Sequence, residues 1–232
     1  MSDRVRLWLA WGVHLLTASG ALVGVLALLA IDRGELQAAA ILMLVAMAID
    51  SLDGGFARAV GVSRLTPGFD GRRLDDMVDY LNYVVVPCVF LAAGGLVPHW
   101  VAVAPPILAS AYGFSQVDAK TEDDFFLGFP SYWNVIAIYA WLLEVRPELT
   151  AAIVAGFAAL VFVPQKYVYP SKLRVLRRTT YALTAAAAAA VAWSILEPER
   201  ARALRVPEVT LLYPAWYLGL SLWLGGVRLR RA

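Results

Sequence analysis

The chain has 232 residues, of which 60% are hydrophobic and only 16% are charged, and its mean hydropathy is +0.65. Soluble domains carry about 45–50% apolar and about 25% charged residues, so this composition predicts a single integral membrane domain, residues 1–232. The net charge of +2 gives no reason to expect nucleic acid as a partner, and the single cysteine, Cys88, excludes an internal disulfide.

Apolar segments long enough to cross a bilayer recur along the whole chain. A span needs about 20 mostly apolar residues, and it must be helical because lipid offers the backbone no hydrogen bonds. The sequence therefore predicts an all-α, polytopic membrane helical bundle with about eight transmembrane helices. Their approximate bounds are 7–31, 36–58, 74–96, 99–117, 131–145, 149–163, 179–196 and 209–226.

The first of these segments carries a G-x3-G pair, Gly20 and Gly24, and one histidine, His14. Small residues at this spacing indicate close helix packing, either within one subunit or between two. His14 has no metal-ligand partner at a useful spacing, so we expect packing or solvation for it.

Lysine and arginine residues predict the orientation of the bundle. With the N-terminus in the cytoplasm, fifteen of them fall in inside segments and five in outside segments. Because basic residues accumulate on the cytoplasmic side, we expect both termini there, together with the connection between the second and third helices. The basic segment 166–178 has two open roles, which are binding of anionic lipid phosphates and fixing of the topology.

The most informative pattern begins at the end of the second helix. Asp50, Asp53, Gly54, Ala57 and Arg58 follow three- and four-residue spacings, so they form one stripe on that helix. Acids near a bilayer are costly unless they are solvated or paired, and such acids usually have a function. A helical glycine costs about 1 kcal/mol relative to alanine, which is understandable where a ligand approaches the backbone.

A matching stripe, Gly71, Asp75 and Asp79, begins the third helix. The connection contains Pro67 and Gly68 and lets the chain reverse, so two antiparallel helices can each present a pair of carboxylates. Four oxygen donors without a nearby histidine or cysteine suit Mg²⁺ or Mn²⁺ and disfavour Zn²⁺. The pattern predicts a site for two divalent ions that could bind a pyrophosphate.

Two other interpretations of these acids remain open. The carboxylates could be neutralised by the arginines at 58, 64, 72 and 73, or they could form the ion path of a cation transporter. Transport sites lie near the middle of the bilayer, whereas these acids fall at the predicted cytoplasmic end of their helices. Asp76 lies off the stripe, and we expect it to be a solvated or paired acid.

The complete pattern resembles the signature of the CDP-alcohol phosphotransferase family and reads Asp50-x2-Asp53-Gly54-x2-Ala57-Arg58-x12-Gly71-x3-Asp75-x3-Asp79. The usual family form has eight residues between the arginine and the following glycine. The twelve residues here resemble a branch of the family, the bacterial phosphatidylcholine synthases. The segments 79–83, 120–134 and 167–171 also resemble this branch, so the resemblance covers most of residues 1–230.

The resemblance implies an enzyme of the bacterial inner membrane that transfers the phosphatidyl group of CDP-diacylglycerol to choline and releases CMP. It also suggests a homodimer. Serine, inositol or glycerol phosphate remains an alternative acceptor. The implied metal ligands are Asp50, Asp53, Asp75 and Asp79, with Asp79 also the general base. The implied CDP-binding residues are Asp50, Asp53, Gly54, Ala57, Arg58 and Gly71.

Choline would need a site of its own. Its trimethylammonium group cannot donate ordinary hydrogen bonds, so aromatic faces are the expected receptors. The candidates near the predicted cytoplasmic face are Tyr83, Phe126, Tyr132 and Trp133. A phosphorylated acceptor would need additional cations instead. Aromatic residues also form belts at membrane interfaces, which is the alternative role for these four.

Overall fold

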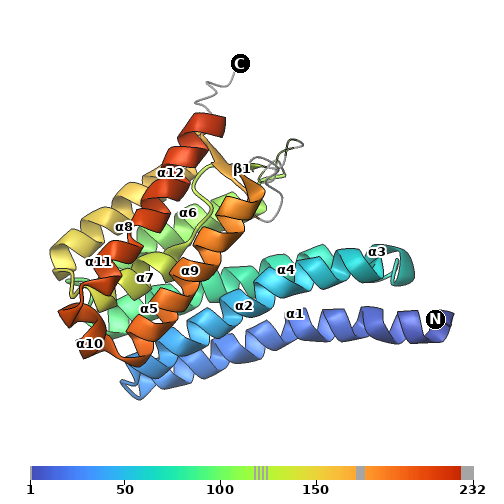
Figure 1. The fold of residues 1–232 in the computed structure, drawn as a ribbon, viewed down its shortest axis with the longest axis horizontal. Coiled ribbons are helices and arrows are strands. Elements are labelled where there is room, and N and C mark those ends of the chain that lie inside the picture. The colour runs from blue at the N-terminus through green and yellow to red at the C-terminus, as the bar shows by residue number, and fades with distance from the viewer. Residues whose placement is uncertain are drawn as a thin grey trace.

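The computed structural model describes residues 2–117, 119, 121, 123, 125–170 and 176–225. Helices dominate this part of the chain, which confirms the predicted all-α class (Figure 1). The elements are α1 (Asp3–Asp32), α2 (Leu36–Val60), α3 (Val62–Leu65), α4 (Gly71–Asp79), the π-helix η1 (Tyr80–Val85), α5 (Val86–Ala93), the 3₁₀-helix η2 (Trp100–Val103), α6 (Ala104–Ser115), β1 (Phe125–Leu127), α7 (Trp133–Leu142), α8 (Pro147–Val161), β2 (Lys166–Val168), α9 (Arg177–Leu196), α10 (Pro198–Ala203), α11 (Val206–Thr210) and α12 (Leu212–Gly225).

Among the described residues, four helical stretches are long and apolar enough to cross a membrane. They are Arg4–Asp32, Leu36–Val60, Gly71–Ala93 and Arg178–Leu196. Shorter apolar helices cover Trp100–Ser115, Trp133–Leu142 and Pro147–Val161. Every one of the eight predicted segments contains helix, but the number of eight spans stays a prediction because several of these helices are short.

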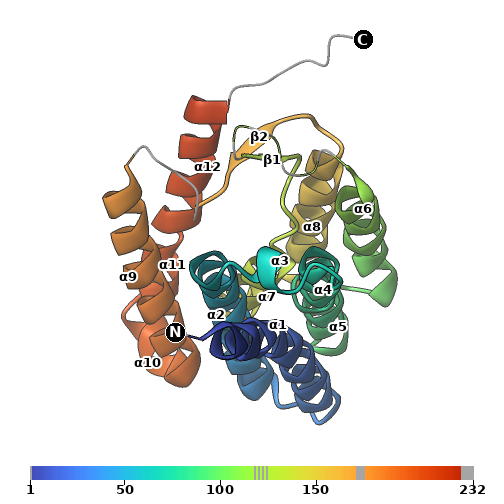
Figure 2. The same ribbon diagram turned by 90° about the vertical axis from the view of Figure 1, so that its right-hand side faces the viewer.

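The first three long helices form one packed group. α1 lies along α2, and it also packs against the continuous helix that α4, η1 and α5 form (Figure 1). Seen end-on, α9 to α12 lie on one side of this group and α6 and α8 on the other (Figure 2). The main hydrophobic core joins α5, α7 and α8 and includes the fully buried Phe90, Ile138 and Val154.

Gly20 and Gly24 allow the close approach of α1 to the third long helix. A methyl group at Gly20 would lie 2.9 Å from Cγ1 of Val78, and one at Gly24 would lie 2.6 Å from Oδ1 of Asn82. The Asn82 side-chain amide donates a hydrogen bond to the backbone carbonyl of Gly20 at 3.0 Å. The glycine pair therefore serves packing within one subunit, one of the two roles that the sequence leaves open.

A π-helical turn, η1, interrupts the third long helix directly after the aspartates. Its last bond runs from the backbone N–H of Val86 to the carbonyl of Leu81, five residues earlier. Pro87 follows, has no N–H to donate and crowds the carbonyl four residues before it, which favours a wider turn at this place. Such turns are frequent at functional sites, and the sequence pattern did not predict this one.

Two short strands form the other unpredicted feature. β1 and β2 pair antiparallel, with Phe125 opposite Val168 and Leu127 opposite Lys166. β2 packs against α12, where the Ser221 hydroxyl accepts from the backbone N–H of Val168 at 3.1 Å. This two-stranded sheet joins the α6–α7 connection to the α8–α9 connection and lies beside α12 (Figure 2).

Candidate active site

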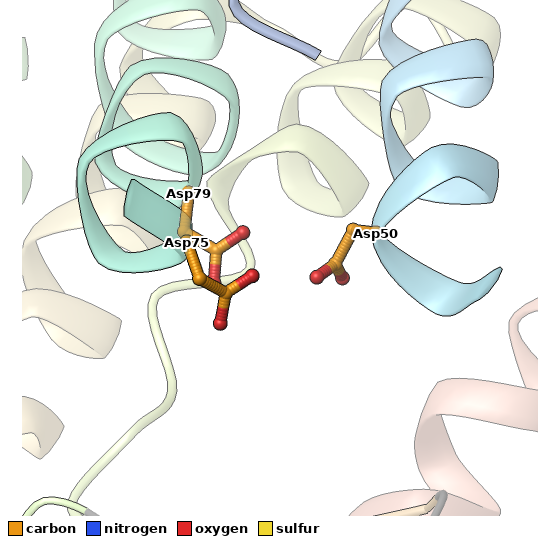
Figure 3. Close-up of side chains that lie close together, drawn as sticks. All are labelled: Asp50, Asp75 and Asp79. Carbon is orange, nitrogen blue, oxygen red and sulfur yellow. The ribbon is translucent and has the colours of Figure 1, made fainter. Parts of the chain in front are cut away.

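Asp50, Asp75 and Asp79 lie together between α2 and α4. One oxygen of each carboxylate lies within 4.8 Å of one oxygen of each of the others. Asp50 points from α2 across the gap toward Asp75 and Asp79, which lie on successive turns of α4 (Figure 3). The i, i+4 spacing in the sequence thus places both α4 acids on the face that meets α2.

The donor set of this three-carboxylate group fits a hard divalent cation. Carboxylates so close together repel one another, and a cation among them removes that repulsion. All three side chains are half-buried, so water screens the repulsion less than at an open surface. Oxygen-only ligands suit Mg²⁺, Mn²⁺ or Ca²⁺, so these residues could hold such an ion.

Asp53 lies near the three-carboxylate group but is not part of it. Its side chain is buried, and one carboxylate oxygen accepts a hydrogen bond from the Thr17 hydroxyl of α1 at 2.6 Å. It nevertheless lines the same small cavity as the other three aspartates. All four acids therefore line one cavity, and the Asp53 carboxylate is hydrogen-bonded to α1.

Tyr83 borders this cavity from η1. Its hydroxyl donates a hydrogen bond to Oδ2 of Asp50 at 2.6 Å, and its side chain is buried. The sequence singles out Tyr83 only as an aromatic candidate for choline. The bond to Asp50 was not predicted, although Tyr83 lies four residues after Asp79 and so continues the stripe of Gly71, Asp75 and Asp79. Thr17 lies in the middle of α1, and nothing in the sequence connects it with Asp53.

Gly54 of the α2 stripe and its neighbour Gly55 face space rather than tightly packed neighbours. Among the described residues, and leaving the backbone of α2 aside, no atom lies within 4 Å of the position that a methyl group would take at Gly55, and at Gly54 such an atom belongs to the Arg58 guanidinium, at 3.4 Å. Packing thus does not require either glycine, in agreement with a surface that a ligand approaches. Ala57 packs on a small cluster that includes Val13.

The His14 side chain of α1 packs closely against Gly71, a contact that the sequence did not predict. A methyl group here would lie 2.8 Å from the His14 ring. His14 is buried, lies 3.0 Å from the Thr66 hydroxyl through Nε2 and packs against the Phe69 ring at 4.4 Å. His14 therefore supports the α3–α4 connection, which confirms the packing role expected for it.

The four aromatic candidates for choline occupy different surroundings. The rings of Tyr83 and Tyr132 lie next to each other in a tilted arrangement, with their centroids 6.1 Å apart. Phe126 packs on Tyr169 at 4.5 Å. Trp133 is fully buried in the core, where its indole N–H donates to the Ser110 hydroxyl at 2.7 Å.

One residue of the basic segment has a specific partner. The Lys166 ammonium is mostly buried, pairs with the Asp123 carboxylate and lies over the Phe125 ring. Hydrogen bonds from Lys166 and Thr121 hold the pKa of Asp123 below its usual range. Lys120, Lys172 and Arg174 lie outside the described residues. Arg72 lies 4.0 Å from Asp76, which confirms the expected pairing of that acid.

Comparison with known proteins places this site in a family. Residues 13–193 match the CDP-alcohol phosphatidyltransferase family. That range is most of the chain and includes the whole aspartate pattern, so the chain belongs to this family of membrane enzymes.

Relatives within this family are phosphatidylcholine synthases. The chain is 43% identical to the phosphatidylcholine synthase of Legionella pneumophila over 171 residues, which cover 72% of this chain and 67% of the relative. It is 35% identical to the enzyme of that name from Borreliella burgdorferi over 221 residues, 94% of each chain. The Pseudomonas aeruginosa phosphatidylcholine synthase is 38% identical over 178 residues, 75% of each chain.

Proposed function

We propose that this chain is a phosphatidylcholine synthase, which transfers the phosphatidyl group of CDP-diacylglycerol to choline and releases CMP. The observation that carries this proposal is the three-carboxylate group of Asp50, Asp75 and Asp79 at the position of the family pattern. The names of the relatives support choline as the acceptor.

The reaction is a displacement at phosphorus. Asp79 accepts the proton of the choline hydroxyl while the choline oxygen forms a bond to the lipid-bearing β-phosphorus. The bond from that phosphorus to the bridging oxygen breaks, and CMP leaves with this oxygen. Little covalent chemistry is left to the protein, so positioning and charge stabilisation supply most of the rate. Inversion at a chiral phosphorothioate donor would distinguish this direct route from a two-step covalent one.

Asp50, Asp53, Asp75 and Asp79 are the proposed ligands of two divalent ions, Mg²⁺ or Mn²⁺. These ions, when bound, would neutralise the pyrophosphate charge. The Thr17 hydroxyl already holds one oxygen of Asp53, so the other oxygen is the one proposed to bind an ion.

The nucleotide is proposed to lie along the α2 stripe. Gly54 and Ala57 leave this face free of bulky side chains, and among the described residues the Arg58 guanidinium is the side-chain group near Gly54. Arg58 is exposed and carries five fixed donors that suit a phosphate oxygen pair. Asp50, Asp53 and Gly71 complete the proposed CDP-binding residues.

For choline, Tyr83 and Tyr132 are the best placed of the four aromatic candidates. Their rings lie next to each other, tilted by 53°, and Tyr83 borders the aspartate cavity. Phe126 belongs to the two-stranded sheet and packs on Tyr169. Trp133 would have to support this site from the core, because none of its surface is exposed.

The chain is proposed to work as one catalytic domain, residues 1–232, in the bacterial inner membrane. The distribution of basic residues supports a cytoplasmic location for both termini and the active site. A homodimer is proposed from the family resemblance alone.

Incorporation of radiolabelled choline into lipid by the purified protein tests this function. Product should require CDP-diacylglycerol and Mg²⁺ or Mn²⁺, disappear with a chelator and form from choline in preference to serine, inositol or glycerol phosphate. Label incorporation that does not depend on CDP-diacylglycerol would contradict the proposal, and preference for another of these alcohols would replace the acceptor.

A further inference from the structure

Both acids of α2 accept short hydrogen bonds from hydroxyl groups that lie outside the aspartate pattern. The Tyr83 hydroxyl of η1 donates to Oδ2 of Asp50, and the Thr17 hydroxyl of α1 donates to Oδ2 of Asp53, each at 2.6 Å. Both donors and Asp53 are buried. Hydrogen bonds to an ionised carboxylate are shorter and stronger than those between neutral groups, so each bond restrains the carboxylate that it reaches.

We infer that Tyr83 and Thr17 are positioning residues of the metal site, which fix the orientation of the Asp50 and Asp53 carboxylates before an ion binds. This inference rests on the metal-binding part of the proposed function. Each hydroxyl engages one carboxylate oxygen and sets the rotation of the group, so the direction of the other oxygen is fixed. Partners of this kind typically contribute 10- to 100-fold to metal affinity.

The surrounding fold holds both donors in place. Asn82, the neighbour of Tyr83, bonds to the Gly20 carbonyl of α1, and the Tyr83 ring packs against Tyr132. Thr17 lies one turn before Gly20 on α1, where its hydroxyl also contacts the carbonyl of Val13 at 3.3 Å. A single helix, α1, therefore supports both donors, one directly and one through η1.

The chain offers a matched control for each donor. The Tyr80 hydroxyl, three residues before Tyr83, donates to the carbonyl of Ile107 in α6 at 3.1 Å. Thr150 is a buried threonine of α8 whose hydroxyl bonds to the carbonyl of Arg146 at 3.3 Å. The same atom can thus be removed at the site and away from it, in Tyr83→Phe against Tyr80→Phe and in Thr17→Val against Thr150→Val.

The decisive measurement is Mn²⁺ binding to the purified full-length protein without substrate. The electron paramagnetic resonance signal of free Mn²⁺ reports how much of the ion stays unbound. We expect Tyr83→Phe and Thr17→Val to raise the Kd for Mn²⁺ at least about 10-fold. Tyr80→Phe and Thr150→Val should stay within twofold of the wild type. Thr17→Ser, which keeps the hydroxyl, should restore most of the affinity lost in Thr17→Val.

Several outcomes would overturn the inference. A Kd within twofold of the wild type in both Tyr83→Phe and Thr17→Val would do so, and so would equal losses in site and control variants. Size-exclusion elution and thermal unfolding in detergent identify a variant that has failed to fold. In that case Tyr83→Leu and Thr17→Ala repeat the comparison, since both remove the hydroxyl with a smaller side chain that cannot clash.

A kinetic measurement separates positioning from choline binding. Tyr83→Phe keeps the aromatic ring, so the KM for choline at saturating Mn²⁺ should change less than threefold while the Mn²⁺ concentration needed for half-maximal rate rises at least about 10-fold. A change confined to the choline KM would assign Tyr83 to the substrate and overturn its role toward Asp50. The Mn²⁺ binding result stands even if choline is not the acceptor, so the two proposals can fail separately.

Discussion

Replacing Gly24 by alanine should disturb the site from a position that lies outside it. The added methyl group would lie 2.6 Å from Oδ1 of Asn82 and 3.0 Å from Cδ2 of Leu81. The first distance is too short for a real contact and the second is very tight, so α1 and η1 must separate or Asn82 must turn. Turning Asn82 breaks its hydrogen bond to the Gly20 carbonyl.

The size of the effect follows from two opposing contributions. Forcing a methyl group into a packed interface typically costs about 1–3 kcal/mol, whereas alanine is favoured over glycine inside a helix by about 1 kcal/mol. Gly12→Ala in the same helix is the control, because within the described part of the chain no atom outside the α1 backbone lies within 4 Å of its added methyl group. The two variants should therefore differ by about 1–3 kcal/mol in the free energy of unfolding.

Gly24→Ala should also lower the activity of each folded molecule. Asn82 is the neighbour of Tyr83, and a shift of about 1 Å at a reacting group can lower the rate about 100-fold. Choline incorporation per folded molecule and thermal unfolding in detergent measure the two effects. If Gly24→Ala matches Gly12→Ala in both assays, the argument that η1 is held by close contact with α1 is wrong.

Three further predictions concern the acids. Asp79→Asn should abolish product while binding of CDP-diacylglycerol stays largely intact, and near-normal turnover would exclude Asp79 as the base. Asp50→Asn should weaken Mn²⁺ binding at least about 10-fold, and an unchanged affinity in a titration would remove Asp50 from the ligand set. The pKa of Asp123 is lowered by its pairing with Lys166, so this pairing stabilises the folded state. The stabilisation is complete above the ordinary carboxyl pKa of about 3.9 and is lost as the pH falls through the lowered pKa. Because Asp123 is half-exposed, Asp123→Asn should cost less than about 1 kcal/mol at neutral pH and reduce the loss of thermal stability below pH 4; an unchanged acid profile would refute the pairing.

Local sequence was sufficient for much of this protein. Apolar segments predicted the helices because lipid leaves the backbone no other arrangement. Three- and four-residue spacing placed Asp75 and Asp79 on one helix face, and that face does meet Asp50. Periodicity along one helix is a local property, so a single sequence reveals it.

Other features depended on contacts between residues far apart in the chain. The pairing of β1 with β2 joins segments about forty residues apart, and neither strand is long enough to show a pattern of its own. Four-residue spacing puts Tyr83 on the stripe of Asp75 and Asp79, but only the packing of η1 beside α2 decides that its hydroxyl reaches Asp50. Trp133 was predicted as a choline candidate, with a place at the membrane interface as the alternative, whereas its indole N–H donates to Ser110 inside the core. The sequence by itself therefore showed which residues form the site. Tertiary packing decided the partner of each polar group, because a hydrogen bond forms only where the fold brings donor and acceptor within reach.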